Sequence, residues 1–409
     1  MASAARQVAG APAAQPALPD EILEDIFLRL DAAADLDRAS AACTTFRRVV
    51  SARRFLRRFR SLHPPPLLGF LESNRPGAFH PADPPHRSAP AARALAQAAD
   101  FSFSFIPNPT PNSWNVCDAR DGRVLLYWRA GETDAFVDLV VCDPLHRRYV
   151  QLPPIPDDLA VSTGARGMPD FDPFLDPASK EKKDEDDDDD LSFGVVCTVQ
   201  CQHKLVTFHF SPVTGKWRAC MFNRMLSLPS ADMALYTGVF GRHHAHGCIY
   251  WTIYGSSGML MQDTREMRIS RVEIPTVTYR RQKAIVEAGE GRLGLLALDD
   301  CMFHLYCKSL RNNCIGTEEW HHVRTIPLPK LDSHWRMIGT AKGYLLLEVI
   351  PQDPSRITSS SQQMPAAQYF TLDLKTFLVE RLSVSNQPIE IKRAHLYSIF
   401  PPPLSLPRI

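Results

Sequence analysis

The residues of this sequence best suited to chemistry are two groups of histidines. His243, His244 and His246 lie within four positions, and His321-His322 follow farther along the chain. Neutral imidazoles are good ligands for zinc and copper. Adjacent residues of a strand point to opposite faces, so only His244 and His246 could share one ligand sphere, with a third ligand from elsewhere. This group supports the hypothesis of a metal-dependent enzyme; the alternative is that these histidines belong to the turn before a strand that begins at Gly247.

Other signals of catalysis are weak. Cys197 and Cys201 are four positions apart on a predicted strand and would share a face. Zinc-binding cysteine pairs usually sit in a tight turn, so we interpret these two as core thiols. The phosphate-loop pattern and the Gly-x-Ser-x-Gly elbow of hydrolases do not occur in the sequence. We therefore predict no catalytic residue, no bound metal and no cofactor, and a chain that is not an enzyme.

Composition limits the possible partners. The 409 residues include 46 basic and 45 acidic side chains, so net charge does not indicate nucleic acid or a membrane surface. No run approaches the roughly 18 apolar residues of a membrane span. The basic stretch 47–60 holds seven arginines. No aromatic or base-reading residues are interleaved on the basic face, so we interpret it as the exposed side of a helix whose Phe55 and Phe59 are buried. Ten cysteines without a CxxC pair fit reduced thiols in the cytoplasm or nucleus.

Residues 18–63 are predicted to form a small module of three helices. The first begins at Pro19 and carries an apolar stripe with a period of 3.6 residues, opposite an acidic side. Two shorter helices are predicted to follow, one through Leu36 and Phe46 with Asp35 as its cap. About 45 residues bury little surface alone, so the stripe is expected to need a partner.

The remaining chain divides by composition. Residues 1–17, rich in alanine and proline, are predicted to be a disordered tail. Residues 64–100 are rich in proline and are predicted to be a linker. From residue 101 to about 400 the pattern has period 2, beginning with the alternating run Phe101–Ile106, and predicts an all-β domain. The acidic run within 180–190 is predicted to be a solvated insertion.

A weak repeat runs through the β region. A glycine opens an apolar strand at five positions that are 44 to 72 residues apart, and in four units a turn and a further strand follow: the glycines are Gly122, Gly194, Gly247, Gly291 and Gly343. Four strands in each 40 to 50 residues are typical of propeller blades. The fold class we predict is therefore α+β multidomain: a three-helix module followed by a β-propeller of six or seven blades, closed by segments such as Phe101–Ile106 and Ala394–Phe400. An irregular β-sandwich is the alternative.

Residues 18–63 resemble an F-box. The resemblance rests on Leu18-Pro19-Asp20-Glu21-Ile22-Leu23, on Ile26-Phe27-Leu28-Arg29-Leu30, and on Cys43-Thr44-Thr45-Phe46-Arg47 at fixed offsets. The end of the module, 53–64, is similar to large plant F-box families, and the β region more weakly resembles their F-box-associated, propeller-like domains.

The resemblance implies the substrate-recognition subunit of a Skp–cullin–F-box ubiquitin ligase. Its F-box would bind the Skp-family adaptor and, through it, cullin, while the β domain would hold an unknown target protein; a scaffold without ubiquitylation activity is a further alternative. Carried over by position, the adaptor-binding residues would be Leu18, Pro19, Ile22, Leu23, Ile26, Phe27, Leu30, Leu36, Ala39, Cys43, Phe46 and Arg47. The family often has tryptophan where this chain has Phe46, which keeps an apolar anchor but lacks the indole donor.

Overall fold

The computed structural model divides into two compact units. It describes residues 18–30, 33–63, 65–73, 78–107, 114–128, 137–163, 171–176, 193–201, 204–223, 242–252, 258–279, 281–311, 314–315, 319–329, 333–341, 343–351, 367–385 and 393–400. The predicted tail 1–17 and the predicted acidic insertion 180–190 lie outside these residues. One unit contains residues 1–65 and 400–405, and is called the helical unit; the other, residues 66–399 and 406–409, is called the β domain.

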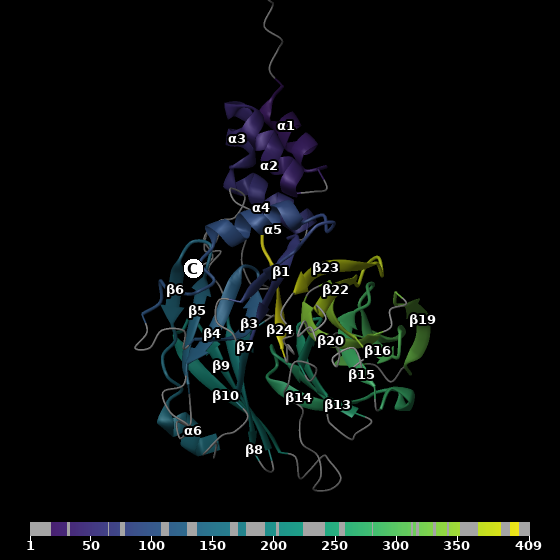
Figure 1. Cartoon of the computed structure of the whole chain (residues 1–409). Coiled ribbons are helices and arrows are strands. Elements are labelled where there is room, and N and C mark those ends of the chain that lie inside the picture. The colour runs from purple at the N-terminus through teal and green to yellow at the C-terminus, as the bar shows by residue number, and fades with distance from the viewer. Residues whose placement is uncertain are drawn as a thin grey trace, which may run out of the picture. The chain divides into compact units, whose positions relative to one another are not determined.

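The helical unit contains four helical segments, one more than predicted (Figure 1). They are α1 (Asp20–Phe27), α2 (Ala33–Ala42), α3 (Thr44–Val50) and α4 (Arg53–Leu62). The expected second helix is divided at Cys43, whose backbone is extended and whose sulfur accepts a hydrogen bond from the Phe46 backbone N–H at 3.4 Å. Cys43 therefore caps α3, while Asp35 lies inside α2 rather than capping it. No helix among the described residues is long and apolar enough to cross a membrane.

Aromatic rings form the centre of the helical unit. Phe27 of α1 meets Phe46 edge-on, with ring centroids 5.1 Å apart, and Phe55 of α4 at 6.4 Å. Phe55 stacks on Phe59, which in turn contacts Phe400. Edge-to-face pairs at these distances are the favoured geometry of aromatic cores.

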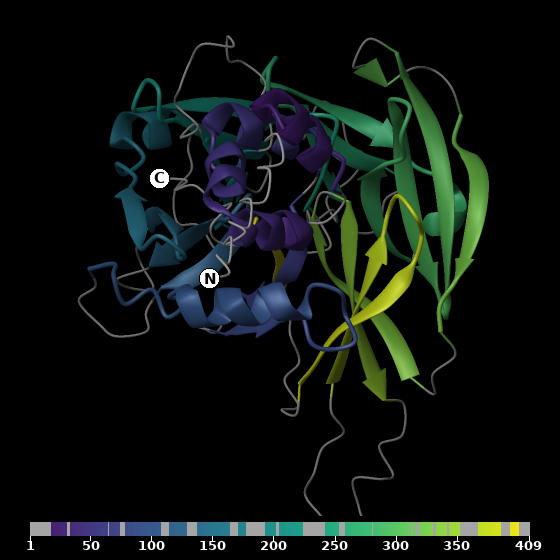
Figure 2. The ribbon, with the colours of Figure 1, turned by 90° about the horizontal axis from the view of Figure 1, so that it is seen from above.

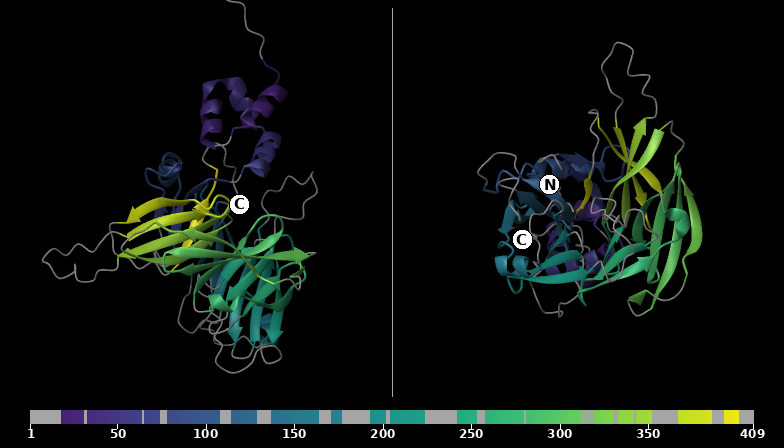
Figure 3. Two further views of the ribbon diagram at one scale, coloured as in Figure 1. Left: turned by 90° about the vertical axis from the view of Figure 1, so that its right-hand side faces the viewer. Right: turned by 90° about the horizontal axis from the view of Figure 1, so that it is seen from below.

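The described strands of the β domain form six sheets, arranged in a ring (Figure 3, right). This confirms the predicted propeller and sets the number of blades at six. The first sheet contains β24 (Ala394–Ser398), β1 (Leu67–Glu72) and β2 (Phe79–Pro81), and the second contains β3 (Asn115–Arg120), β4 (Arg123–Trp128), β5 (Asp138–Asp143) and β6 (Arg148–Gln151). The third sheet contains β7 (Phe171–Leu175), β8 (Val195–Cys201), β9 (Lys204–Ser211) and β10 (Lys216–Asn223), and the fourth contains β11 (Arg242–Ala245), β12 (Cys248–Thr252), β13 (Gly258–Asp263) and β14 (Arg268–Glu273). The fifth sheet contains β15 (Gln282–Glu287), β16 (Arg292–Asp299) and β17 (Met302–Arg311) with β18 (Cys314–Ile315) and β19 (His321–Pro327), and the sixth contains β20 (Ser333–Ala341), β21 (Tyr344–Pro351), β22 (Ala367–Asp373) and β23 (Val379–Ser385).

The repeated glycines of the sequence mark one turn of the blades. Gly122, Gly247, Gly291 and Gly343 lie between the first and second strands of their sheets, with φ between 67° and 85°. Such a positive φ is strained for residues with a Cβ atom and is common in two-residue hairpins. Gly194 also precedes a second strand, β8, but without a positive φ.

Aspartates stabilise the turn between the third and fourth strands in three of the blades. Asp143, Asp263 and Asp373 each accept hydrogen bonds through Oδ1 from the backbone N–H groups two and three positions later, at 2.8 to 3.1 Å. Aspartates stabilise turns in this way because the side chain replaces a backbone acceptor. The turn predicted to follow the apolar strand of a repeat unit is therefore confirmed at these three aspartates, which also give its physical cause.

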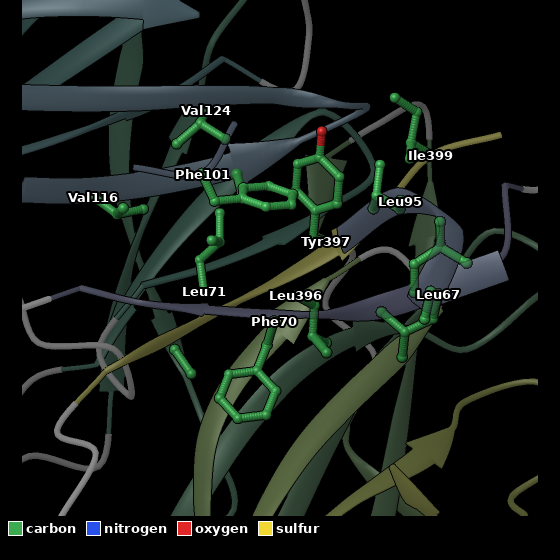
Figure 4. Close-up of a cluster of buried hydrophobic side chains, with 14 of the residues drawn as sticks. Leu67, Phe70, Leu71, Leu95, Phe101, Val116, Val124, Leu396, Tyr397 and Ile399 are labelled. Carbon is green, nitrogen blue, oxygen red and sulfur yellow. The ribbon is translucent and has the colours of Figure 1, made fainter. Parts of the chain in front are cut away.

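The ring closes where the two ends of the β domain meet. β24 pairs antiparallel with β1, in the register Phe70↔Leu396, and a large buried apolar cluster surrounds the pair (Figure 4). The Tyr397 hydroxyl donates a hydrogen bond to the Gly122 carbonyl at 3.0 Å. A Cβ atom on Gly122 would come within 2.6 Å of Ile399. The prediction that the segment at Ala394–Phe400 closes the ring is thus confirmed.

The expectation of a linker over 64–100 was wrong. This interval contains β1 and β2 of the first blade, and α5 (Ala89–Ala98), which packs against both strands (Figure 2, blue helix). Every residue of β1 is buried. A strand that is covered on both faces has a continuous apolar run, so β1 lacks the alternating pattern by which strands were predicted. None of the prolines lies in β1: Pro81 is the last residue of β2, and Pro90 lies in the first turn of α5. The remaining described helices are α6 (Asp157–Thr163) and the 3₁₀ turn η3 (Thr276–Thr278).

The predicted strand at Phe101–Ile106 is instead a series of turns. Phe101, Phe103 and Ile106 are buried, so the alternating burial was read correctly. The backbone does not extend because Asp100 accepts hydrogen bonds from the Ser102 and Ser104 hydroxyls at 2.5 and 2.6 Å, and Phe103 has a positive φ.

Candidate functional site

An exposed apolar stripe runs along α1 of the helical unit. Leu18, Ile22 and Ile26 are spaced by four residues and are 54%, 47% and 44% exposed. Residues four apart lie on one face of a helix, so Ile22 and Ile26 share a face of α1. Leu18 lies just before the N-cap residue Pro19 and adds a third exposed apolar side chain at the start of the helix. Leu23 and Phe27, on the neighbouring face of the same helix, are 4% exposed and fill the core of the unit. We call Leu18, Ile22 and Ile26 the α1 stripe.

Ion pairs tie the acidic residues of α1 to the other helices. Two nitrogens of Arg48 in α3 donate to the two oxygens of Asp20, at 2.6 and 2.9 Å. Arg58 of α4 donates to Asp25 at 3.5 Å. The hydrogen bond and the charge of Asp20 raise the pKa of Arg48. Exposed pairs of this kind add little stability. They join α1 to α3 and α4, while the burial of Leu23 and Phe27 leaves Ile22 and Ile26 at the surface.

The twelve predicted adaptor-binding residues fall into three groups. Six are exposed: Leu18, Pro19, Ile22, Ile26, Cys43 and Arg47. Three are half-buried: Leu30, Ala39 and Phe46. Leu23, Phe27 and Leu36 are buried within the helical unit and are placed to support the exposed ones. The structure therefore divides the twelve predicted residues between the surface and the core of the helical unit.

The position of the stripe can now be compared with known proteins. Residues 16–61 match the F-box-like family model. This region covers α1 to α4 except for the last residue of α4, and we refer to it as the F-box-like region. The chain is thus a short helical F-box-like region followed by a large six-bladed β-propeller. A search of curated proteins finds no match to the sequence.

Solved structures similar to this chain have low identity to it. They include a chain of the nidogen/laminin complex (9% identity, 81% of this chain and 97% of that chain, TM-score 0.37). Oligogalacturonate lyase in complex with manganese has 12% identity, with 66% and 64% of the two chains covered and a TM-score of 0.36. For the tricorn protease these values are 11%, 67%, 27% and 0.30. The chain spans just under two thirds of the lyase and about a quarter of the protease.

The β domain holds a second candidate site, a cluster of charged side chains on the inner strands of the ring. Asp172 of β7 accepts a hydrogen bond from Arg242 of β11 at 2.7 Å and another from Arg393, next to β24, at 2.8 Å. Asp118 of β3 lies 3.9 Å from Arg242 and 3.6 Å from His395 of β24. These contacts join four of the six blades. We call Asp118, Asp172, Arg242, Arg393 and His395 the central cluster.

Burial and pairing set the protonation states of the central cluster. Burial opposes ionisation of Asp118, but a hydrogen bond from His395 and the charge of Arg242 outweigh it and lower the pKa of this carboxyl group. Burial lowers the pKa of His395 to about 4. His395 is therefore neutral at pH 7: Nε2 lies 2.9 Å from the Ser73 hydroxyl, which can donate to it, and Nδ1 faces Asp118.

The histidines that suggested a metal site are placed differently. His244 lies on β11 beside Phe174, with ring centroids 5.5 Å apart. His246 has a positive φ in the turn before Gly247, and its Nε2 lies 2.9 Å from the Arg292 carbonyl oxygen, to which it can donate. His246 is therefore the turn residue of the alternative interpretation. Among the described residues, no three or more His, Cys, Asp or Glu side chains are arranged to hold a metal ion.

The other candidates from the sequence have structural surroundings. His322 lies on the exposed strand β19, where its ring contacts Tyr306 and His304. Cys197 is fully buried, and burial raises the pKa of its thiol, as expected of a core residue. The side chain of Cys201 lies outside the described residues.

Sequence reasoning missed the central cluster. Its members are spread over 278 positions, from Asp118 to His395, and only Arg393 and His395 are close to each other in the sequence. The one local signal is a charged residue within an otherwise apolar strand, as at Asp118 and Asp172. Such residues are rarely buried unless they are paired, so they predict partners but do not identify them.

We expect the variant His395→Asn to reduce the acid sensitivity of the β domain. In the wild type, the pKa of His395 is about 4 in the folded state and about 6.5 when unfolded, so the unfolded state binds more protons as pH falls through this window. Between pH 7.5 and pH 5 the wild type should lose about 2 kcal/mol of unfolding free energy more than the variant. Urea unfolding followed by tryptophan fluorescence at both pH values measures this difference.

The comparison of His395→Asn with the wild type controls for the other buried histidines. His244 and His209, whose pKa values are also lowered by burial, are present in both proteins, so their contributions cancel. Equal losses in the two proteins would contradict the assignment of His395 as a neutral buried residue.

Proposed function

We propose that this protein is the substrate-recognition subunit of a Skp–cullin–F-box ubiquitin ligase. The F-box-like region would bind a Skp-family adaptor and through it cullin, and the β-propeller would hold the target protein. The observation that carries the proposal is the α1 stripe: three large exposed apolar side chains of an F-box-like region, with Ile22 and Ile26 on one face of α1 and Leu18 just before the helix. Association through the apolar face of a helix, with anchors four residues apart, is a common mode of protein recognition.

The proposed role needs no chemistry in this chain. The receptor would raise the concentration of a target lysine near the ubiquitin-conjugating enzyme, which performs the transfer. Sheet-to-sheet packing gives the propeller a rigid frame, and the loops between its strands are the natural place for contacts with a target. Such a complex would act in the cytoplasm or the nucleus.

Two substitutions in the α1 stripe test the proposal. The double variant Ile22→Glu/Ile26→Glu should bind a purified Skp-family adaptor at least tenfold more weakly, because two charged groups would have to be buried at the interface. Its folding should change little, since both side chains are already nearly half exposed. Titration of the labelled full-length chain with adaptor measures the dissociation constant.

Leu62→Glu provides a matched control. Leu62 lies in the same unit, at the end of α4, and is 58% exposed. This variant introduces the same acidic side chain at an equally exposed apolar position outside the stripe, so its affinity should equal that of the wild type. If both variants bind as tightly as the wild type, or if the wild type does not bind any adaptor of the Skp family, the proposed docking surface is wrong.

A further inference from the structure

The core of the helical unit includes a residue from the far end of the sequence. Phe59 and Phe400 are 341 positions apart, yet their rings meet edge-on with centroids 6.0 Å apart. The guanidinium carbon of Arg60 lies 5.7 Å from the centroid of the Phe400 ring. Both kinds of contact are favourable, and Phe400 is only 3% exposed. Phe400 therefore packs as a member of this core, in agreement with its place in the helical unit.

A row of rings connects this contact to α1. Phe59 stacks on Phe55 at 6.0 Å, and Phe55 meets Phe27 of α1 at 6.4 Å. Phe59 also lies 4.4 Å from the ring of His63, whose Nε2 is 2.8 Å from the Leu28 carbonyl oxygen, to which it can donate. Loss of the ring at the chain end would leave a gap beside Phe59, from which both of these paths lead to the helix that carries the α1 stripe.

The β domain fixes the residues that precede Phe400. Ile399 is 1% exposed and packs closely on Gly122. Before it, β24 ends at Ser398, which is paired with Leu67, the first residue of β1. The stretch of chain that arrives from α4 and the stretch that leads to Phe400 therefore begin at neighbouring positions of one sheet.

This pairing shortens the loop that the contact between Phe59 and Phe400 must close. In a chain whose ring is open, the loop contains about 340 residues. Once β1 and β24 are paired, it is about ten residues long: eight from Phe59 to Leu67 and, from the partner Ser398, two more. The probability of loop closure falls roughly as the 3/2 power of loop length, so ring closure should favour the contact by about 200-fold.

We propose that Phe400 makes the stability of the helical unit, and of its F-box-like region, conditional on a closed propeller. The helices are synthesised before the propeller, but their core lacks one ring until β24 has paired with β1. A unit of about 45 residues has little stability of its own, so without this ring much of it should be unfolded. Chains with an incomplete or open propeller would then not present the α1 stripe. The consequence for adaptor binding rests on the proposed function, whereas the consequence for folding does not.

Hydrogen exchange of the full-length variant Phe400→Ala tests the contact. The amides of 20–62 should exchange at least a hundredfold faster than in the wild type, because a buried ring is lost from the core of the helical unit. The tryptophan-monitored urea midpoint of the β domain should change little. Phe400→Leu keeps a large apolar side chain and should restore most of the protection.

Ile399→Ala is the matched control, because it truncates the adjacent residue on the side of the β domain. It should lower the tryptophan-monitored midpoint and leave the protection of 20–62 unchanged. Unchanged exchange in Phe400→Ala, or equal loss of protection in the two alanine variants, would overturn the proposal.

A flexible insertion tests the dependence on ring closure. A segment of about 20 glycine and serine residues between Ile399 and Phe400 retains every side chain but lengthens the loop from about 10 to about 30 residues, so the protection of 20–62 should fall about fivefold. The same segment between Thr214 and Gly215, in the exposed turn between β9 and β10, should leave it unchanged. Equal protection in the two insertion proteins would contradict the dependence on a closed ring.

Adaptor titration separates this proposal from the proposed function. If the wild type binds a Skp-family adaptor, Phe400→Ala should bind it at least twofold more weakly, in proportion to the unfolded fraction of the helical unit, and Phe400→Leu should recover the affinity. Full affinity in a Phe400→Ala protein whose helical unit is mostly unfolded would contradict the link to binding. If the wild type binds no adaptor but the exchange results hold, the proposed function fails and the role of Phe400 in folding is supported.

Discussion

The variant Asp172→Ala should lower the unfolding free energy of the β domain by about 3–5 kcal/mol. Its carboxylate is paired with Arg242 at 2.7 Å and with Arg393 at 2.8 Å, and the side chains of Asp172 and Arg242 are each only 6% exposed. Removing one partner of a buried ion pair leaves charges that neither water nor protein compensates. In this case Arg393 loses its ion pair and Arg242 keeps only the longer contact with Asp118 at 3.9 Å, so the loss should lie in the upper part of the range for a single substitution.

Tryptophan fluorescence reports this loss selectively. All six tryptophans, beginning with Trp114, belong to the β domain, so urea unfolding followed by their emission is insensitive to the helical unit. If Asp172→Ala fails to fold, Asp172→Asn keeps the side-chain volume and removes only the charge, and should lose less.

An exposed ion pair of the same domain is the control. Glu266 lies 3.8 Å from Arg268, and both side chains are more than half exposed. Glu266→Ala should therefore change the unfolding free energy by less than about 1 kcal/mol. If Asp172→Ala were no more harmful than Glu266→Ala, the central cluster would not hold the blades together as its geometry indicates.

The turns of the propeller could be predicted from the sequence because their causes are local. The glycines between first and second strands, and the aspartates after third strands, act on the two or three residues beside them. The number of blades was not readable, because one blade is built from both ends of the domain: β1 and β2 come from the interval 64–100, and β24 from residues 394–398. Chain closure of this kind leaves no periodic signal.

The central cluster shows a different limit. Asp172 and Arg393 are separated by 221 positions, and only the ring brings β7 and β24 within reach of one ion pair.

In α1 the sequence predicted the apolar side of the helix but not which of its residues are exposed. Helical periodicity identified the apolar side, but Ile26 and Phe27 differ in exposure because α3 and α4 cover only one edge of it. Which part of a broad apolar stripe is covered depends on the tertiary packing of the unit, which the period of a single helix does not contain.

This division of α1 leads to the second large effect, expected for Phe27→Ala. Phe27 is 4% exposed and contacts the rings of both Phe46 and Phe55. Truncation of a buried phenylalanine costs about 3–5 kcal/mol. A unit of this size has only a few kcal/mol of stability, so the variant should unfold the helical unit in native buffer.

Hydrogen exchange of the full-length chain distinguishes the two faces of α1. In Phe27→Ala the amides of 20–62 should exchange without protection, while the tryptophan-monitored midpoint of the β domain stays unchanged. In Ile26→Ala, which truncates an exposed neighbour, protection should be retained and only adaptor affinity should fall. Because the two residues are adjacent, the pair controls for position in the helix. Retained protection in Phe27→Ala, or its loss in Ile26→Ala, would contradict the assignment of one residue to the core and the other to the docking surface.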